Sequence, residues 1–461
     1  KETVTGQHLY TCLGRALELE AQFDQALAVY QEMEAVARQL HAPAMKLAAL
    51  MARAMLRSIP AQLFNPIEGE ALAEQALSLA RELDAPLAEV KILWTLLNLF
   101  RISARVPQAI ASGERALALA RDLNLPEQMA FILNDVALCY RIDGRLDQAK
   151  ESFHQASVLW RELNNLPMLA DSLAGAAELT VWAGDYHLAL TLSGEAFEIS
   201  QSIANVWGQS HSKLAVGHVY WDHGQPDQAM AVMQDCLRLS ELANYLIPQI
   251  LTRADLAAVY GGLGAFEQGL EAVRQALTTA ETQMPMFQPY ALAKTAQLYG
   301  RQGQYTAAEA AIERGKIQST RAFDLPFVIL AEAELALRQR DYERALAAAN
   351  DLPAHFHQFG LRVYIPEALY LRGKTLWGMG DTKAARNSLL EARTEAEAIG
   401  SRRMLWLILG TLSQLATTPT EANHLRHQAQ EIIHSIADSI GNPELRASFL
   451  GLADVLEIIS L

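Results

Sequence analysis

The feature that most constrains the fold of this chain is a repeat of 40 residues. A length of 461 residues would by itself suggest about three globular domains. Instead, the segment from Ala80 to Pro86 recurs from Ala120 to Pro126 and, slightly altered, from Trp160 to Pro167. The same phase continues at Ser200, Ser240, Ala280 and Thr320, so that six consecutive steps are each 40 residues long. A fixed period of this size indicates an array of structural repeats.

A second set of landmarks predicts one helical hairpin in each repeat. Glycines recur at the same phase, at Gly144, Gly184, Gly224, Gly264 and, one residue early, Gly303. Small residues lie before each glycine and after it, for example Ala137 and Ala149 around Gly144. Glycine adopts the left-handed conformation that ends a helix, and small side chains let two helices approach closely. Each hairpin leaves an apolar face uncovered, so the hairpins are expected to stack into a solenoid.

The glycine, alanine and aromatic positions resemble those of tetratricopeptide repeats, although the unit is 40 residues long and the usual one is about 34. HEAT-type repeats have a comparable period but do not predict these landmarks. The resemblance implies an all-α fold, a right-handed superhelical solenoid of about eleven tetratricopeptide-like hairpins with a C-terminal capping helix. Prolines such as Pro43, Pro86 and Pro126 are expected in the first turn of the following helix.

Breaks in the repeat suggest how the solenoid is divided. A surplus within Ile59–Pro66 indicates a looped or bulged connection. A shortened step predicts a kink at 351–366, which would separate an N-terminal solenoid portion, 1–350, from a C-terminal portion, 367–461. The helix expected from Pro443 onward closes the open end of the stack or, as the alternative, forms a dimer contact.

Composition and motifs argue against several classes of function. The net charge of −14 disfavours direct nucleic-acid binding, and no apolar stretch is long enough for a membrane span. Three scattered cysteines (Cys12, Cys139 and Cys236) are typical of reduced residues in a cytoplasmic protein. No phosphate-binding loop, nucleophile elbow or metal-ligand motif occurs, so no catalytic residues, metal or cofactor are predicted. An enzyme using Asp171 and Glu178 as paired carboxylates is the least favoured alternative.

The tetratricopeptide resemblance also implies where a ligand or partner would bind. In such solenoids the first helix of each hairpin lines the concave groove. Applied to this chain, that rule gives a strip of aromatic, charged and amide side chains: Trp94, Asn98, Arg101, Asn134, Arg141, Asp171, Glu178, Trp182, His211, His218, Trp221, Asp222, Asp255, Tyr290, Lys294, Gln297 and Arg301. Farther along, the same rule points to Glu334, Arg338, Tyr370, Lys374 and Trp377. Flat aromatic faces beside fixed polar groups are typical of recognition surfaces.

A second resemblance suggests the biological role. Repeats near 40 residues with a closing segment at Pro443–Leu450 are similar to the C-terminal sensor regions of bacterial STAND-class signal-transduction ATPases, the class of the maltotriose-responsive activators. The resemblance implies a cytoplasmic module that recognises a protein or small-molecule inducer in the concave groove. Because the chain opens on Lys1, we expect a longer protein in which this region contacts and controls an N-terminal NTPase or effector, such as a transcription regulator. The alternative is a constitutive scaffold that binds helices or tails of partner proteins.

Overall fold

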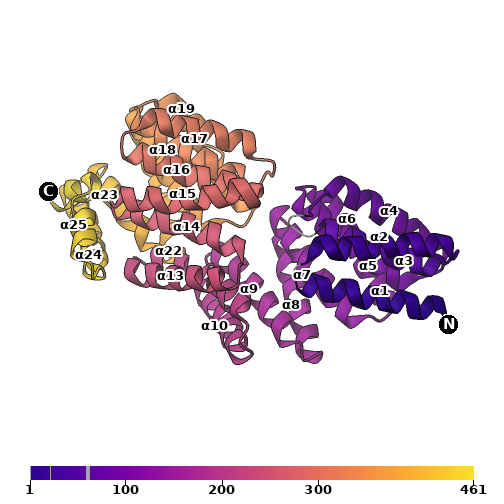
Figure 1. Ribbon diagram of the computed structural model, residues 1–461. Coiled ribbons are helices and arrows are strands. Elements are labelled where there is room, and N and C mark those ends of the chain that lie inside the picture. Colours follow the sequence, from indigo (N-terminus) through magenta and orange to yellow (C-terminus); the bar gives the residue numbers. More distant parts are fainter. Residues whose placement is uncertain (1, 21, 59–62, 461) are drawn as a thin grey trace. The chain divides into compact units, whose positions relative to one another are not determined.

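The computed structural model describes residues 2–20, 22–58 and 63–460, and its regular structure is helical throughout those ranges (Figure 1). The chain divides into two compact units, Lys1–Asn164 and Asn165–Leu461. The predicted bulge at Ile59–Pro66 lies partly outside the described residues. Its described end is a turn that leads into a helix beginning at Pro66.

The first unit consists of four helical hairpins. Its helices are α1 (Glu2–Leu19), α2 (Phe23–Gln39), α3 (Pro43–Ser58), α4 (Pro66–Glu82), α5 (Pro86–Ile102), α6 (Val106–Asp122), α7 (Pro126–Ile142) and α8 (Leu146–Glu162). Pro43, Pro86 and Pro126 each occupy the first position of a helix, as predicted, where the missing backbone N–H costs no hydrogen bond.

The second unit contains seven further hairpins, some with interrupted helices. Its elements are α9 (Leu166–Trp182), α10 (Tyr186–Ser202), α11 (Val206–Lys213), α12 (Val216–Asp222), α13 (Pro226–Leu242), α14 (Leu246–Gly262), α15 (Phe266–Gln283), η1 (Pro285–Phe287), α16 (Gln288–Arg301), α17 (Tyr305–Gln318), α18 (Leu325–Arg338), α19 (Tyr342–Ala349), α20 (Leu352–Gln358), η2 (Arg362–Tyr364), α21 (Ile365–Gly378), α22 (Thr382–Ile399), α23 (Arg402–Gln414), α24 (Pro419–Asp438), α25 (Pro443–Leu450) and α26 (Ala453–Ile459). With the first unit this makes eleven hairpins in the described residues, which confirms the predicted fold class.

The repeat landmarks produce this hairpin geometry as predicted. Gly144, Gly184, Gly224 and Gly264 all adopt positive φ angles, between 73° and 81°, at the turn between the two helices of a hairpin. Where no glycine is present, Ala104 takes the same conformation, with φ 59°. Close helix packing explains the small residues, because a Cβ atom on Gly217 would lie 2.5 Å from Met233.

The irregular stretch at 351–366 is present, but it lies inside the second unit. It forms α20 and η2, an additional short turn of chain between the hairpins α18–α19 and α21–α22. Phe356 and Leu361 from this stretch are almost completely buried in the core of the second unit. The boundary between the two compact units instead lies between Asn164 and Asn165, where the 40-residue spacing is undisturbed.

The second unit curves back on itself, so that its last hairpins contact the turns of its first ones. Ser439 after α24 donates a hydrogen bond to the carbonyl oxygen of Gly224, 3.2 Å away. The Gly441 N–H donates to the Asp227 carboxylate at 2.7 Å, across 214 residues of sequence. A Cβ atom on Gly264 would lie 2.8 Å from Ser448 Oγ in α25. These contacts close the second unit into a ring of helices.

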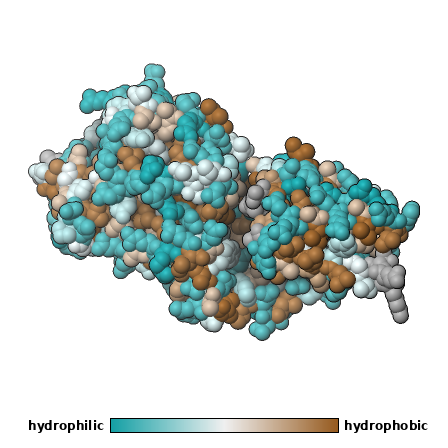
Figure 2. Space-filling view, in the orientation of Figure 1, coloured by the Kyte–Doolittle hydropathy of each residue, from teal (hydrophilic) through white to brown (hydrophobic). Residues whose placement is uncertain are grey.

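The C-terminal segment is not one helix but two, interrupted at Gly451–Leu452. Ile458 of α26 packs so closely on α23 that a Cβ atom on Gly410 would lie 2.3 Å away. The segment therefore covers the last hairpin, while α25 also reaches the α14–α15 turn through Ser448. On the face shown in Figure 2, apolar side chains lie in separate patches among hydrophilic ones.

Candidate ligand-binding cavity

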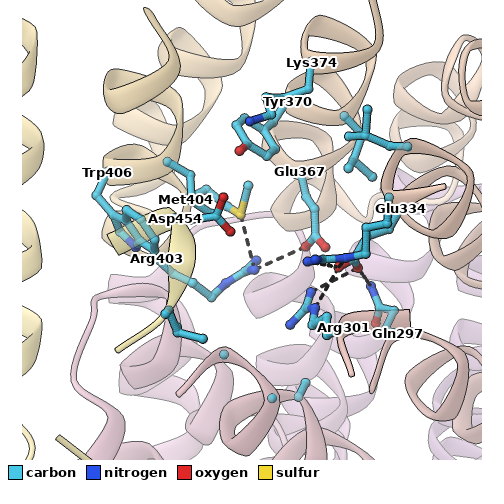
Figure 3. A pocket seen from close by; sticks show the side chains of 18 of the residues that line it. Gln297, Arg301, Glu334, Glu367, Tyr370, Lys374, Arg403, Met404, Trp406 and Asp454 are labelled. Carbon is cyan, nitrogen blue, oxygen red and sulfur yellow. Dashed lines mark hydrogen bonds and ion pairs between the residues drawn. The ribbon is translucent and has the colours of Figure 1, made fainter. Parts of the chain in front are cut away.

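The ring of helices in the second unit surrounds a cavity of about 780 Å³. Most of its wall comes from the first helices of successive hairpins, namely α12, α14, α16, α18, α21 and α23. The C-terminal segment completes the wall with Phe449 and Gly451–Asp454. Every side of the cavity therefore belongs to one compact unit, and residues far apart in sequence face one another across it (Figure 3).

One cluster in the wall is organised around the carboxylate of Glu334. Arg301 donates to both of its oxygens, at 2.7 and 3.1 Å, and Arg338 donates to one of them at 3.1 Å. Gln297 adds a hydrogen bond of 3.2 Å. Burial alone would raise the pKa of Glu334, but the two guanidinium groups outweigh it and hold the pKa at about 2. Glu334 is consequently ionised and fully engaged near neutral pH.

A second cluster joins the two ends of the ring. Arg403 of α23 donates to Asp222 of α12 at 2.8 Å and to Glu367 of α21 at 3.2 Å. Tyr186 of α10 donates a short hydrogen bond to the same Asp222 carboxylate. Burial works against the charge of Arg403, but its two carboxylate partners raise its pKa above the ordinary value. Both ends of the ring thus meet in a buried ionic contact on the cavity wall.

Two lysines on the wall differ from these paired groups. Lys294 of α16 is only 7% exposed, and among the described residues it has no carboxylate within 4.0 Å. Its ammonium lies 5.1 Å from the centre of the Tyr290 ring and 5.5 Å from that of Tyr364. Burial lowers the pKa of Lys294. Lys374 of α21 likewise has aromatic neighbours, with Tyr370 at 6.0 Å and Trp377 at 5.9 Å.

Aromatic side chains supply the flat apolar surfaces of the cavity. Trp221, Tyr364, Tyr370, Trp377 and Trp406 all line it. The Trp221 ring fits there only because position 262 is glycine, since a Cβ atom on Gly262 would lie 2.4 Å from Trp221 Cζ2. The glycine pair 261–262 of α14 thus opens space at a place where the other first helices carry long side chains.

The structure brings part of the predicted strip together in this cavity. His218, Trp221, Asp222, Lys294, Gln297 and Arg301 line it, as do Glu334, Arg338, Tyr370, Lys374 and Trp377. Asp255 and Tyr290 lie behind this layer: Tyr290 donates to Asp255 at 2.5 Å, and His218 Nε2 lies 2.8 Å from the same carboxylate. Their role is to position cavity residues.

Other predicted residues of the second unit lie outside the cavity lining. His211 Nδ1 is 3.0 Å from Asp171 Oδ1, so Asp171 is paired with imidazole and not with Glu178. Glu178 accepts a hydrogen bond of 3.4 Å from Trp182 Nε1. The ring of Trp182 stacks on Tyr364 at 5.9 Å, which places it in the packing layer.

The remaining predicted residues belong to the first unit. Trp94 Nε1 and Asn98 Nδ2 both donate to Asp135, at 2.6 and 2.9 Å. Arg101 donates to Asn98 at 2.9 Å. Asn134 is buried in α7, and Arg141 lies one hairpin turn farther along the same helix. These five residues therefore form a polar group separate from the cavity, organised by Asp135, which the prediction omitted.

The prediction also missed several cavity residues. Glu367 lies 13 residues before Gly380, in the same phase as His211 before Gly224, so the groove rule could have found it. The α23–α24 hairpin has no turn glycine to mark its phase, which hid Arg403 and Trp406. Tyr364 and Asp454 lie in irregular segments, where no repeat rule applies.

The geometry defines the chain as a helical-repeat binding module with an enclosed site. Residues 88–405 match the family described as the MalT-like TPR region. The chain belongs to this family, which agrees with the resemblance to tetratricopeptide sensor regions. No curated protein sequence matches the chain.

Solved structures show the same kind of fold at low sequence identity. A Rap protein complexed with competence and sporulation factor is 15% identical, with a TM-score of 0.57 over 78% of this chain and 98% of its own. The apo form of RapI is 12% identical, with a TM-score of 0.48 over 59% of this chain and 98% of its own. The first of these similarities supports the repeat fold.

Two searches of the described residues concern other kinds of site. None of the helices there combines the length and apolar character that crossing a membrane requires. Within the same ranges, no three His, Cys, Asp or Glu side chains are grouped as metal ligands.

Proposed function

We propose that residues 165–461 form the ligand-sensing module of a larger bacterial signalling protein. An inducer binds in the cavity of the second unit and controls an effector, an NTPase, that precedes this region. Membership in the MalT-like family supports the link to an effector. The cavity supports the binding of an inducer.

The observation that carries the proposal is the contact of Arg403 with Asp222. These residues are 181 positions apart, yet both line the cavity. A ligand that fills the cavity therefore touches the first and last helices of the ring at once. If it binds the closed ring more tightly than an opened one, it shifts the population toward closure, and that shift is the signal.

A direct test measures ring closure with and without ligand. Spin labels at Gln234→Cys in α13 and His434→Cys in α24 report the distance between the two ends, with Cys12→Ser removing the exposed native thiol. A metabolite library is first screened for compounds that raise the melting temperature saturably. We expect such a compound to narrow the distance distribution between the labels. An unchanged distribution in the presence of a saturating ligand would contradict a sensor role.

The scaffold alternative predicts a different result. A constitutive scaffold binds its partner protein without added metabolite. Stoichiometric capture of one protein from a native lysate, unaffected by the compounds that raise the melting temperature, would favour the scaffold over the sensor.

A further inference from the structure

We propose that the ligand of this cavity is a small organic anion, whose carboxylate or phosphate group is bound by Lys294 and Lys374 and whose apolar body packs against the surrounding aromatic rings. The inference rests on the proposed sensor function and adds the chemical class of the inducer.

The first argument is the position of Lys294. Its side chain is 93% buried by complement of its 7% exposure, it lines the cavity, and among the described residues no carboxylate lies within ion-pairing distance. Aromatic rings at 5.1 and 5.5 Å provide weak attraction for the ammonium, but no counter-charge. A buried charge without an ionic partner is costly, so groups of this kind are normally paired. An anionic ligand would supply the partner that the chain itself does not.

Lys374 provides a second amine on the same wall. Glu367, Tyr370, Lys374 and Trp377 follow one another at helical spacing along α21 and all line the cavity. Figure 3 shows Lys374 beside Tyr370 on this helix. An aromatic ring next to an unpaired ammonium suits a ligand that joins a flat apolar group to an acidic one.

The carboxylates of the wall are already engaged, which argues against a cationic ligand. Glu334 is bound by two arginines, and Asp222 and Glu367 share Arg403. The fourth lining carboxylate, Asp454, is exposed to solvent. The acidic residues of the strip therefore bind the chain's own cations, and the groups left for a ligand are basic.

A neutral sugar fits this arrangement less well. Its hydroxyl groups would accept hydrogen bonds from the lysines but would leave the charge of Lys294 uncompensated. A charge-assisted contact between an ammonium and an anionic oxygen is about twice as strong as a neutral one. The wall thus favours an anion over an uncharged molecule of similar shape.

The test compares probes that differ only in charge. Phenylacetate and 4-hydroxybenzoate are paired with their amides, and glucose 6-phosphate with glucose, so that carboxylate and phosphate sources are distinguished. Calorimetric titrations use the whole chain, the variants Lys294→Met and Lys374→Met, and the matched control Lys150→Met on the exposed face of α8. We expect at least one anion to bind more tightly than its neutral partner, and each cavity variant to weaken it at least tenfold. The control should bind as the wild type does.

Folding of the variants is checked by their melting temperatures without ligand. Lys294→Met removes an unpaired buried charge, so we expect its melting temperature to be equal to or above that of the wild type. Lys374 is only partly buried, and its variant provides a second test if Lys294→Met fails to fold.

The outcomes separate the two proposals. Equal binding of neutral and charged partners, or wild-type affinity in both lysine variants, would refute the anion while leaving a sensor function intact. A library in which no compound binds would refute both.

Discussion

Replacing Arg403 by methionine tests whether the ring of the second unit depends on its buried ionic contact. The substitution keeps much of the side-chain volume and removes the only cation that contacts both Asp222 and Glu367 in the described structure. If the ring is closed as described, both carboxylates remain buried without a counter-charge.

The magnitude follows from the burial of the three groups. The Arg403 side chain is 19% exposed, and those of Asp222 and Glu367 are 7% and 11% exposed. Removing one partner from such a buried pair typically costs about 3–5 kcal/mol. For a unit of this size, that corresponds to a decrease of roughly 10 °C in melting temperature.

The assay combines thermal unfolding with hydrogen exchange read by mass spectrometry. We expect the second unit of Arg403→Met to melt earlier and peptides from α12, α21 and α23 to lose protection, while peptides from the first unit keep theirs. Arg393→Met is the matched control: Arg393 pairs with Glu397 on the surface of α22, and such pairs contribute about 0–1 kcal/mol.

A double-mutant cycle identifies the cause. Adding Asp222→Asn to Arg403→Met removes one of the two uncompensated carboxylates and should recover a substantial part of the lost stability. A loss below about 1 kcal/mol in Arg403→Met, or no recovery in the double variant, would refute the reasoning.

Two further predictions concern the cavity wall. The pKa of Glu334, about 2, is below its ordinary value of 4.5, so its contribution to stability is present above pH 4.5 and is lost as the pH falls toward 2. Urea unfolding should show Glu334→Gln less stable than the wild type by roughly 3 kcal/mol at neutral pH, with the difference shrinking in acid; a difference that is independent of pH would contradict this. Gly262→Ala should lower the melting temperature, at a cost of about 1–3 kcal/mol, because its Cβ would overlap the Trp221 ring. Gly194→Ala, in open space on α10, should be neutral or stabilising, and equal effects of both changes would refute the packing argument.

The fold could be predicted because its determinants are local. Gly144 and its counterparts end a helix through their own backbone conformation, and Pro86 or Pro126 begins one. Each such signal acts within a few residues and recurs every 40, so the sequence repeats the instruction. The cavity residues on first helices, such as Lys294 and Arg301, followed from the same phase.

The closure of the ring could not be predicted in this way. It depends on small rotations between hairpins that accumulate over seven repeats, and no single repeat encodes the sum. The contact of Arg403 with Asp222 is a product of that sum, as is the position of the C-terminal segment over the cavity. The same reasoning explains the pairing of the acids, which made the strip look mixed in charge although the residues left unpaired are basic.

Ring closure also explains how one set of side chains can serve both stability and signalling. An open solenoid exposes its concave face along its whole length, so a small ligand touches only two or three neighbouring hairpins. In the second unit, Arg403 on α23 and Asp222 on α12 belong to one wall, and a ligand beside them contacts hairpins from both ends. Its binding energy is then coupled to the free energy of closing the ring, because opening would separate the groups that bind it. A buried ionic contact at this place makes closure sensitive to charge, so an anion on the neighbouring lysines acts on the same balance that Arg403 maintains.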